Sequence, residues 1–188
     1  MKEWNLTTQQ LRQTAPELRV FDRVLLSGTI YTARDAAHKR FFALLDEGRP
    51  LPVDLTDAAI YYAGPTPAPE GRPIGSCGPT TSSRMDPYAP RLMDLGLVCM
   101  IGKGPRSQAV YDAVVRNRGV YLCALGGAGA LAAASIEASE VVAFDDLGCE
   151  SVKRLTVRDF PLVVAADCGG GNIFAAGRAG YLASHPAV

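Results

Sequence analysis

The feature that most constrains the fold is a succession of apolar strand, glycine-containing turn and helix in the second half of the chain. Leu97–Ile101 is a continuous apolar run, which predicts a buried strand, and the turn at residues 102–105 joins it to a helix with apolar positions 109, 110, 113 and 114. We expect Gly119 to end this helix as its C′ residue. A second apolar run, Val120–Leu125, leads through a glycine-rich turn into a small-residue helix over 130–135. This alternation of strand and helix predicts an α/β fold.

The remaining segments add one long helix and further strands. Residues 21–31 alternate around Gly28, which predicts a core strand with a bulge or a close backbone approach at the glycine. Residues 32–35 match a capping box in its Asp form, so we expect Thr32 to cap a helix from about Ala33 to Glu47. The pair Asp86-Pro87 is expected to begin a short helix that ends at Gly96. Further strands are predicted over residues 51–56, 58–64, 141–144, 152–157 and 161–166.

Composition and charge bound the class of protein. With 188 residues, 48% of them hydrophobic, the chain fits a single domain over residues 1–188, with a disordered tail from about residue 183. Nineteen basic and nineteen acidic residues cancel, so the net charge favours neither a nucleic acid nor a membrane surface as partner. No apolar run approaches the roughly 20 residues that span a bilayer, and no apolar leader segment follows Met1, so we expect a soluble, cytoplasmic protein.

The cysteines give no sign of a metal centre within this chain. There are five, an odd number, they are widely spaced, and no two of them form a C-x-x-C pair. This pattern argues against a disulfide framework and against a self-contained metal site. We therefore predict no metal-ligating residues here and expect most of the cysteines to be small buried side chains.

The strongest candidate site lies in the segment Gly75–Arg106, which gathers hydroxyl and cationic side chains around one predicted helix and one strand. Arg84 and Lys103 of this segment, and Arg34 outside it, each lie near a predicted helix start. Arginine binds a carboxylate through two hydrogen bonds and lysine adds a point charge, so together the three cations match a dicarboxylate. Thr80 and Thr81 add hydroxyl groups between them.

Three other motifs carry competing interpretations. Gly127–Ala132 fits the dinucleotide-binding pattern G-x-G-x-x-G/A after a predicted strand, with acidic residues 145 and 146 near the distance expected for a ribose ligand. A non-catalytic dinucleotide-binding or regulatory module stays open as the alternative function. The same residues also have a structural interpretation, because small-residue turns arise where a helix and a sheet pack closely. Lys103 belongs to no Walker A motif, because Gly104-Pro105 replaces the required Ser or Thr. We expect His38 to lie on the surface or to pack, rather than to act as a catalyst.

Several long strings in the chain resemble one known family. They read LLSGTIYTARDAAHKR at residues 25–40, GPTTSSRMDPYAP at 78–90, IGKGPRS at 101–107 and VYLCALGGAGAL at 120–131, followed by DLG at 146–148 and DFP at 159–161. Together they extend over nearly the whole chain. By these strings the chain is similar to the β subunit, or C-terminal domain, of iron-sulfur-dependent class I fumarases and L-tartrate dehydratases.

The resemblance implies a fold and a partner. The fold is a swivelling β/β/α three-layer domain that covers an active site built jointly with another subunit. In the family, three cysteines of the α part hold a 4Fe-4S cluster that acts as a Lewis acid on the substrate hydroxyl. This chain has no cysteine set resembling those ligands. The resemblance therefore implies a hetero-oligomer in which a separate α subunit brings the cluster, and a chain that is inactive alone.

The resemblance also implies roles for individual residues in the reversible hydration of a four-carbon dicarboxylate. Arg34 would bind one substrate carboxylate, and Arg84 and Lys103 would hold carboxylate oxygens. Thr80 would be the base at the carbon that gains or loses a proton, which demands strong local help because a free threonine hydroxyl is a poor base. Thr81 is a lesser candidate for hydrogen bonding. Fumarate and malate are the first substrate pair to expect, and L-tartrate and oxaloacetate the next.

Overall fold

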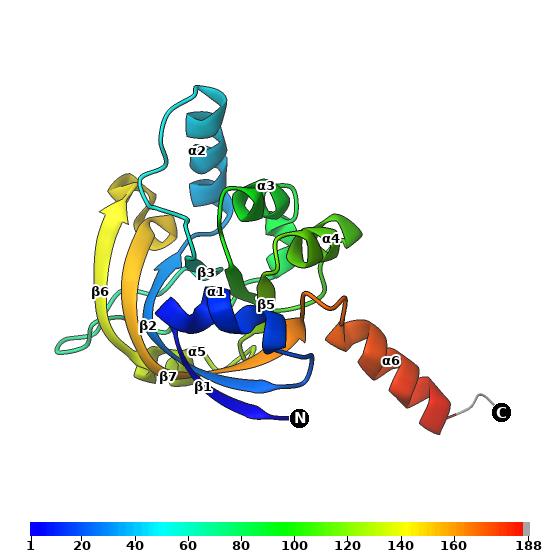
Figure 1. Cartoon of the computed structure of the whole chain (residues 1–188). Coiled ribbons are helices and arrows are strands. Elements are labelled where there is room, and N and C mark those ends of the chain that lie inside the picture. Colours follow the sequence, from blue (N-terminus) through cyan, green and yellow to red (C-terminus); the bar gives the residue numbers. More distant parts are fainter. Residues whose placement is uncertain (186–188) are drawn as a thin grey trace.

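A computed structural model describes residues 1–185 of the chain and shows one seven-stranded sheet with helices packed around it (Figure 1). The strands are β1 (Glu3–Thr7), β2 (Arg23–Thr32), β3 (Ala59–Tyr61), β4 (Cys99–Gly102), β5 (Val120–Cys123), β6 (Ile136–Ala143) and β7 (Val152–Ala166). The α-helices are α1 (Leu11–Thr14), α2 (Asp35–Asp46), α3 (Ala89–Asp94), α4 (Gln108–Arg116), α5 (Gly129–Ala134) and α6 (Ile173–Ser184). Four 3-10 segments join them: η1 (Thr8–Gln10), η2 (Ala15–Glu17), η3 (Ser82–Met85) and η4 (Asp145–Glu150).

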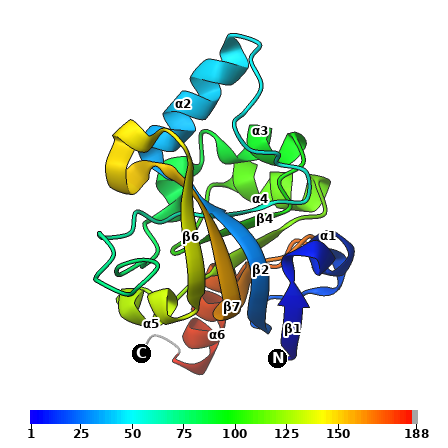
Figure 2. The same cartoon turned by 90° about the vertical axis from the view of Figure 1, so that its left-hand side faces the viewer.

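The long strands β2 and β7 close the sheet on itself. One edge of β2 lies parallel to β1 and then to β3, and its other edge lies antiparallel to β7. The strands β3, β4 and β5 are parallel neighbours, and β5 returns to the end of β7. These pairings make a ring of five strands, with β1 and β6 attached outside it; β6, β7 and β2 lie side by side in Figure 2.

Alternate residues of the inner strands face two separate apolar cores. In β3 and β4, Tyr61 and Ile101 belong to the first core, whereas their neighbours Ile60 and Met100 belong to the second. This follows from the strand geometry, in which successive side chains point to opposite faces. The first core collects residues from all seven strands, and the second packs α2, α3 and α4 against the outer face of the sheet. The result is an α/β fold with two strand layers and one helix layer, as predicted.

The first long helix begins later than the capping box suggested. Its N-cap is Arg34, and Thr32 is the last residue of β2. The Thr32 hydroxyl donates to the Ser151 carbonyl oxygen at 3.3 Å and accepts from the Lys153 amide at 3.1 Å. The prediction that Thr32 caps the helix was wrong because pairing with β7 uses its side chain. Arg34 consequently lies before the first turn of α2 and not inside it.

The helix predicted to begin at Asp86-Pro87 is also displaced, and α3 begins at Ala89. The Asp86 carboxylate instead accepts hydrogen bonds from Arg106 Nε and the Ser107 amide, both at 2.6 Å. A polar side chain that is committed to a distant loop cannot cap the helix that follows it. At the end of α4, the left-handed C′ position is taken by Arg118 (φ 50°), one residue before the predicted Gly119.

Three strand predictions have different outcomes. The bulge in β2 is confirmed, since its pairing with β7 shifts between Leu26 and Gly28. Residues 51–56 form no strand, because the Asp54 carboxylate accepts the Thr56 amide at 2.8 Å and turns the chain locally. Residues 152–157 and 161–166 are one strand, β7, which continues through Asp159 in a left-handed conformation (φ 47°).

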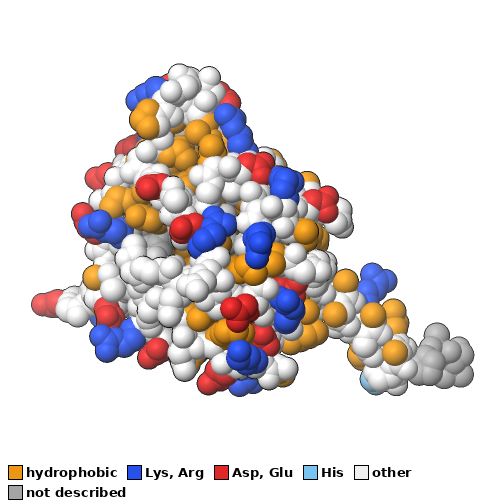
Figure 3. Space-filling model, viewed as in Figure 1, with side chains coloured by type: hydrophobic (Ala, Val, Ile, Leu, Met, Phe, Trp, Pro, Cys, Tyr) orange, Lys and Arg blue, Asp and Glu red, His pale blue; other side chains and the backbone are white. Residues whose placement is uncertain are grey.

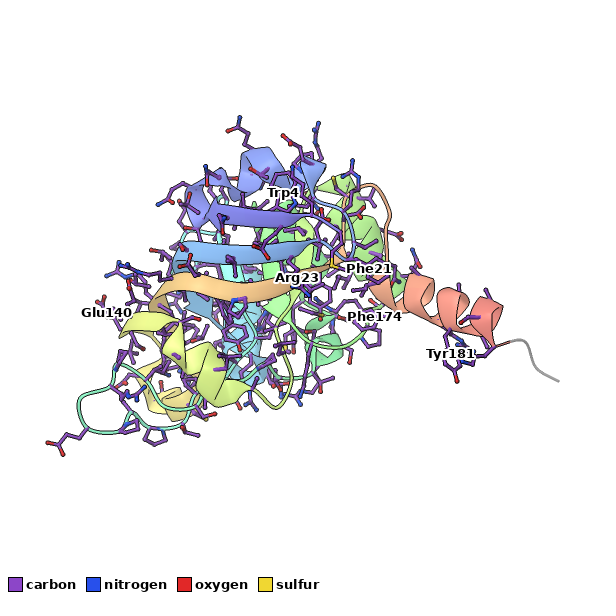
Figure 4. All side chains as sticks on the ribbon, turned by 90° about the horizontal axis from the view of Figure 1, so that it is seen from below. Trp4, Phe21, Arg23, Glu140, Phe174 and Tyr181 are labelled. Atoms are coloured by element: carbon purple, nitrogen blue, oxygen red, sulfur yellow. The ribbon has the colours of Figure 1, made fainter. Side chains whose placement is uncertain are left out.

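Helix α6 projects from the body, and none of its residues is buried. Apolar side chains lie along it in Figure 3, and Figure 4 shows Tyr181 near its far end, away from β7. The helix includes residues 183 and 184 of the predicted disordered tail, whose last residues, 186–188, lie outside the described part. No helix within residues 1–185 combines the length and the apolar character needed to cross a membrane.

The parallel strands β2, β3 and β4 direct three connections to one edge of the sheet. Arg34 follows β2, Gly64 follows β3 and Lys103 follows β4. In open α/β sheets ligands bind at the carboxyl ends of the strands, where such connections meet. This edge is therefore where the predicted cationic residues converge.

Candidate functional site

Arg84 forms the centre of a hydrogen-bonded group that includes Thr80. Its Nε and Nη2 atoms donate to the two carboxylate oxygens of Asp35 at 2.8 and 2.9 Å, and Nη2 also donates to Thr80 Oγ1 at 2.6 Å. Burial acts to raise the pKa of Asp35, but the hydrogen bonds and positive charge of Arg84 outweigh it and hold that pKa below its usual value. Asp35 is therefore ionised at neutral pH. The guanidinium beside Thr80 Oγ1 is that of Arg84, and its Nη1 atom takes no part in the ion pair with Asp35.

Arg34 contacts the same carboxylate as Arg84. Its Nε donates to Asp35 Oδ2 at 3.3 Å, and its Nη2 lies 3.3 Å from Glu150 Oε1. The second oxygen of Glu150 accepts the Ala36 amide at 2.8 Å, which ties η4 to the first turn of α2. A Cβ added at Gly64 would lie only 2.8 Å from Arg34 Nη1 and 3.0 Å from its Cδ. The guanidinium is thus placed by two carboxylates and by the bare backbone of Gly64.

Lys103 is joined to the threonine loop through its backbone. It pairs with Thr81 in a short parallel bridge, its carbonyl oxygen accepts the Ser82 amide at 3.0 Å, and its amide donates to Ser82 Oγ at 2.9 Å. The buried Ser82 hydroxyl also lies 2.9 Å from the Tyr121 hydroxyl. The Lys103 side chain is half-buried, and its Nζ would lie 4.0 Å from a Cβ at Gly126.

The structure therefore joins most of the predicted site residues in one region. Arg84 contacts Thr80 and, through Asp35, Arg34. The backbone of Lys103 is joined to the same loop by Thr81 and Ser82. This geometry can bind a small anion between several cations and can stabilise negative charge on Thr80 Oγ1. Thr81 itself is exposed at the edge of this group.

Three neighbours of the candidate residues were missed by the sequence interpretation. The pairing of Asp35 with Arg84 gave no signal, because the two residues lie 49 positions apart. Glu150 gave no signal, because only the fold brings η4 next to the start of α2. Gly64 was assigned only to a strand, because a glycine that makes room for a distant side chain cannot be told from a turn glycine in the sequence.

The glycine turn after β5 packs closely against a neighbouring loop, and this packing explains its small residues without a bound nucleotide. The Gly129 carbonyl oxygen accepts the Cys77 amide at 3.0 Å, and a Cβ at Gly129 would lie 2.3 Å from Ser76 Oγ. The carboxylate of Asp146, proposed for a ribose, forms a two-oxygen ion pair with Arg40 of α2. Both observations favour close packing over nucleotide binding at Gly127–Ala132.

The cysteines do not assemble into a ligand set. Within residues 1–185, no group of three or more His, Cys, Asp or Glu side chains is arranged to hold a metal ion. Cys77 and Cys99 are fully buried in the apolar first core, and burial raises the pKa of the Cys77 thiol to about 12. Neutral, dispersed thiols of this kind do not fit an iron-sulfur cluster, which needs converging thiolates.

The chain matches a known protein family over most of its length. The family model described as "Fumarase C-terminus" matches residues 1–177. The chain is 44% identical over 157 residues to "Fumarate hydratase class I, anaerobic" of Escherichia coli, covering 82% of this chain and 29% of the relative. It is 40% identical over 167 residues to "Fumarate hydratase 2" of Leishmania major, covering 88% of this chain and 29% of the relative.

A relative of similar length also matches. The chain is 37% identical over 169 residues to "Putative L(+)-tartrate dehydratase subunit beta" of Methanocaldococcus jannaschii, and the match covers 87% of each chain. By contrast, the chain spans only 29% to 30% of the length of the first fumarase relatives that it matches. The family model and this full-length match show that the chain belongs to the fumarase C-terminus family.

Proposed function

We propose that this chain is the β subunit of a hydro-lyase that reversibly hydrates or dehydrates a four-carbon dicarboxylate. The observation that carries the proposal is the 2.6 Å hydrogen bond from Arg84 Nη2 to Thr80 Oγ1, within a group that also contains Arg34 and Lys103. The names of the relatives, fumarate hydratase and a putative tartrate dehydratase subunit, support the same reaction class. Fumarate and malate are the first substrate pair that we propose, and L-tartrate and oxaloacetate the second.

The chemistry assigned to this chain is proton transfer next to a carboxylate. Removal of a proton from the carbon beside a carboxylate places the remaining negative charge on the carboxylate oxygens, where nearby cations stabilise it. Thr80 Oγ1 accepts that proton as an alkoxide, and the hydrogen bond from Arg84 favours the charged form of the hydroxyl. Arg34 and Lys103 bind the carboxylate groups and hold the reacting carbon near Thr80.

Asp35 and Glu150 set how much positive charge the site presents. In the free chain they engage Arg34 and Arg84, so neither guanidinium faces the site without a counter-charge. A substrate carboxylate can add hydrogen bonds at the remaining guanidinium nitrogens without breaking the pair between Arg84 and Asp35. We propose that the two acidic residues hold the arginines in the orientation needed for binding.

The missing half of the site belongs, in this proposal, to a partner α subunit in a hetero-oligomer. When bound there, a 4Fe-4S cluster would supply a Lewis acid toward the substrate hydroxyl. The support for a partner is the match to a protein named as a subunit β, which covers 87% of each chain.

Anaerobic co-expression with a cysteine-bearing candidate partner, followed by assays with malate and L-tartrate, tests this function. We expect a stable complex in which Thr80→Ala and Arg84→Ala each lower kcat by about 10²-fold or more, as loss of a proton acceptor or of an oxyanion donor does. Arg116→Ala is the matched control, because Arg116 makes only an exposed ion pair with Asp94. Absence of a complex, or unchanged activity in Thr80→Ala and Arg84→Ala, would contradict the proposal.

A further inference from the structure

Three buried polar atoms behind the site have no hydrogen-bond partner within residues 1–185. They are Nε2 of His38, the hydroxyl of Tyr62 and Nη2 of Arg106. The ring centroids of His38 and Tyr62 are 5.5 Å apart, and the guanidinium carbon of Arg106 lies 5.3 Å from the Tyr62 centroid. Unsatisfied buried groups are few in native proteins. Three of them in one place therefore indicate a shared polar function.

The hydrogen bond of His38 fixes which of its ring nitrogens carries the proton. Nδ1 lies 2.9 Å from the Arg34 carbonyl oxygen, which can only accept, so Nδ1 is the donor. Burial lowers the pKa of His38 to about 4, and the charge of Arg106 acts in the same direction. The ring is therefore neutral at pH 7, and Nε2 presents a lone pair toward the interior.

The donors and acceptors of the three side chains complement one another. Arg106 can only donate, the Tyr62 hydroxyl both donates and accepts, and His38 Nε2 in this tautomer can only accept. No direct hydrogen bond joins the three atoms within residues 1–185, and bridging waters between Arg106 and Tyr62 and between Tyr62 and His38 would satisfy all of them. Burial raises the pKa of the Tyr62 hydroxyl, and the positive charge of Arg106 opposes this effect.

Each of the three buried residues is bonded to a different part of the site. His38 holds the backbone of Arg34 through the carbonyl oxygen. The carbonyl oxygen of Tyr62 accepts the Thr80 amide at 2.8 Å. Arg106, three residues after Lys103, pairs with Asp86, two residues after Arg84, at 2.6 Å. The three buried residues thus connect every segment that supplies a predicted site residue.

We propose that His38, Tyr62 and Arg106 form a buried relay of hydrogen bonds that positions Arg34 and Thr80 relative to each other. They are positioning residues and touch no substrate. The inference rests on the proposed function for its catalytic consequence, but the relay itself is a property of the free chain. Through it, the apolar second core fixes the distance between the carboxylate-binding arginine and the threonine base.

Two substitutions of His38 test the positioning role. An asparagine side chain places its amide nitrogen near the position of Nδ1, whereas glutamine places it near Nε2, and both lose the ring. Each variant keeps one end of the relay and breaks the other, so in the assembled enzyme we expect both His38→Asn and His38→Gln to raise KM for the dicarboxylate about tenfold with a smaller change in kcat. Wild-type KM values in both variants would show that His38 only packs and would overturn the proposal.

A measurement on the free chain separates this inference from the proposed function. Nitrogen-15 NMR of the histidines reports the tautomer, and we expect a neutral His38 protonated at Nδ1, with an Nε2 shift that changes in Tyr62→Phe. Protonation at Nε2, or no response to Tyr62→Phe, would overturn the relay. An Arg34→Ala enzyme that keeps full activity would instead reject the function and leave the NMR result standing. Thermal unfolding of each variant confirms that it folds.

Discussion

Two arginine–aspartate pairs lie near the candidate site of this protein and differ mainly in burial. The pair Arg84–Asp35 is two-pronged, with bonds of 2.8 and 2.9 Å, and its side chains are 44% and 31% exposed. The pair Arg106–Asp86 has a bond of 2.6 Å, and its side chains are 0% and 12% exposed. The same type of ion pair, arginine with aspartate, therefore occurs both at the surface of the site and behind it.

The difference teaches what burial does to a cation. Water and an incoming anion can reach the guanidinium of Arg84, so it can bind a ligand carboxylate in addition to Asp35. Arg106 is enclosed by the rings of Tyr62 and Tyr121, so it can only hold its surroundings in place. Removing one partner of a buried pair leaves an uncompensated charge, whereas an exposed pair contributes little to stability.

The largest expected effect is on stability at the buried pair. Asp86→Ala leaves Arg106 charged and without its carboxylate, which should lower the free energy of unfolding by about 3–5 kcal/mol. The matched change Asp35→Ala at the exposed pair should cost less than about 1 kcal/mol. Urea unfolding of the two free chains at pH 7 measures both values. Similar losses in the two variants would show that burial does not distinguish the pairs.

An intermediate effect is expected on activity at Gly64. In Gly64→Ala the new methyl group meets Arg34 at 2.8–3.0 Å, so the guanidinium must move away from Asp35 and Glu150. We expect kcat/KM of the assembled enzyme to fall about tenfold, equivalent to about 1.4 kcal/mol. Gly180→Ala is the control, because nothing lies within 4 Å of that position. Wild-type kinetics in Gly64→Ala would mean that Arg34 does not depend on this placement.

The smallest effect is a pH dependence at the exposed pair. The pKa of Asp35 is depressed in the folded chain, so its ionised form contributes stability above its unfolded pKa of about 4. That contribution is lost as the pH falls through the folded pKa. The stability difference between wild type and Asp35→Asn should therefore be present at pH 7, below about 1 kcal/mol, and should vanish in acid. Unfolding curves at several pH values check this; a difference independent of pH would contradict the role of the ionised carboxylate.

The contact between Thr80 and Arg84 could be anticipated from the sequence because it is local. Arg84 and Thr80 lie four residues apart, and the hydroxyl and cationic character of the loop is legible without a fold. The Thr32 cap and the Asp86 cap failed for a common reason: each polar side chain bonds a segment far away in the chain. The contacts of Arg106 and Glu150 could not be predicted from the sequence, because they depend on which strands are neighbours in the fold.

The fold class was predictable for a similar reason, and individual strands less so. Apolar runs such as residues 97–101 are buried in any packing, and they became β4. Residues 51–56 alternate because Val53 and Leu55 are buried in the second core, yet their backbone pairs with no strand. The alternation of apolar residues therefore predicted correctly which side chains are buried, but it predicted wrongly that the segment pairs with a strand. Only the tertiary arrangement decides whether an alternating segment finds a partner.

The closure of the sheet by β7 also constrains how the chain acquires its structure. Residues 23–32 of β2 pair with residues 153–163 of β7, so nearly the whole domain must be present before this ladder forms. Contacts that distant in sequence carry a high loop-closure cost and slow folding. During synthesis, which proceeds from the N-terminus, β2 therefore exposes an open edge until β7 has emerged. A chain interrupted before residue 152 would retain that edge and would be prone to aggregate.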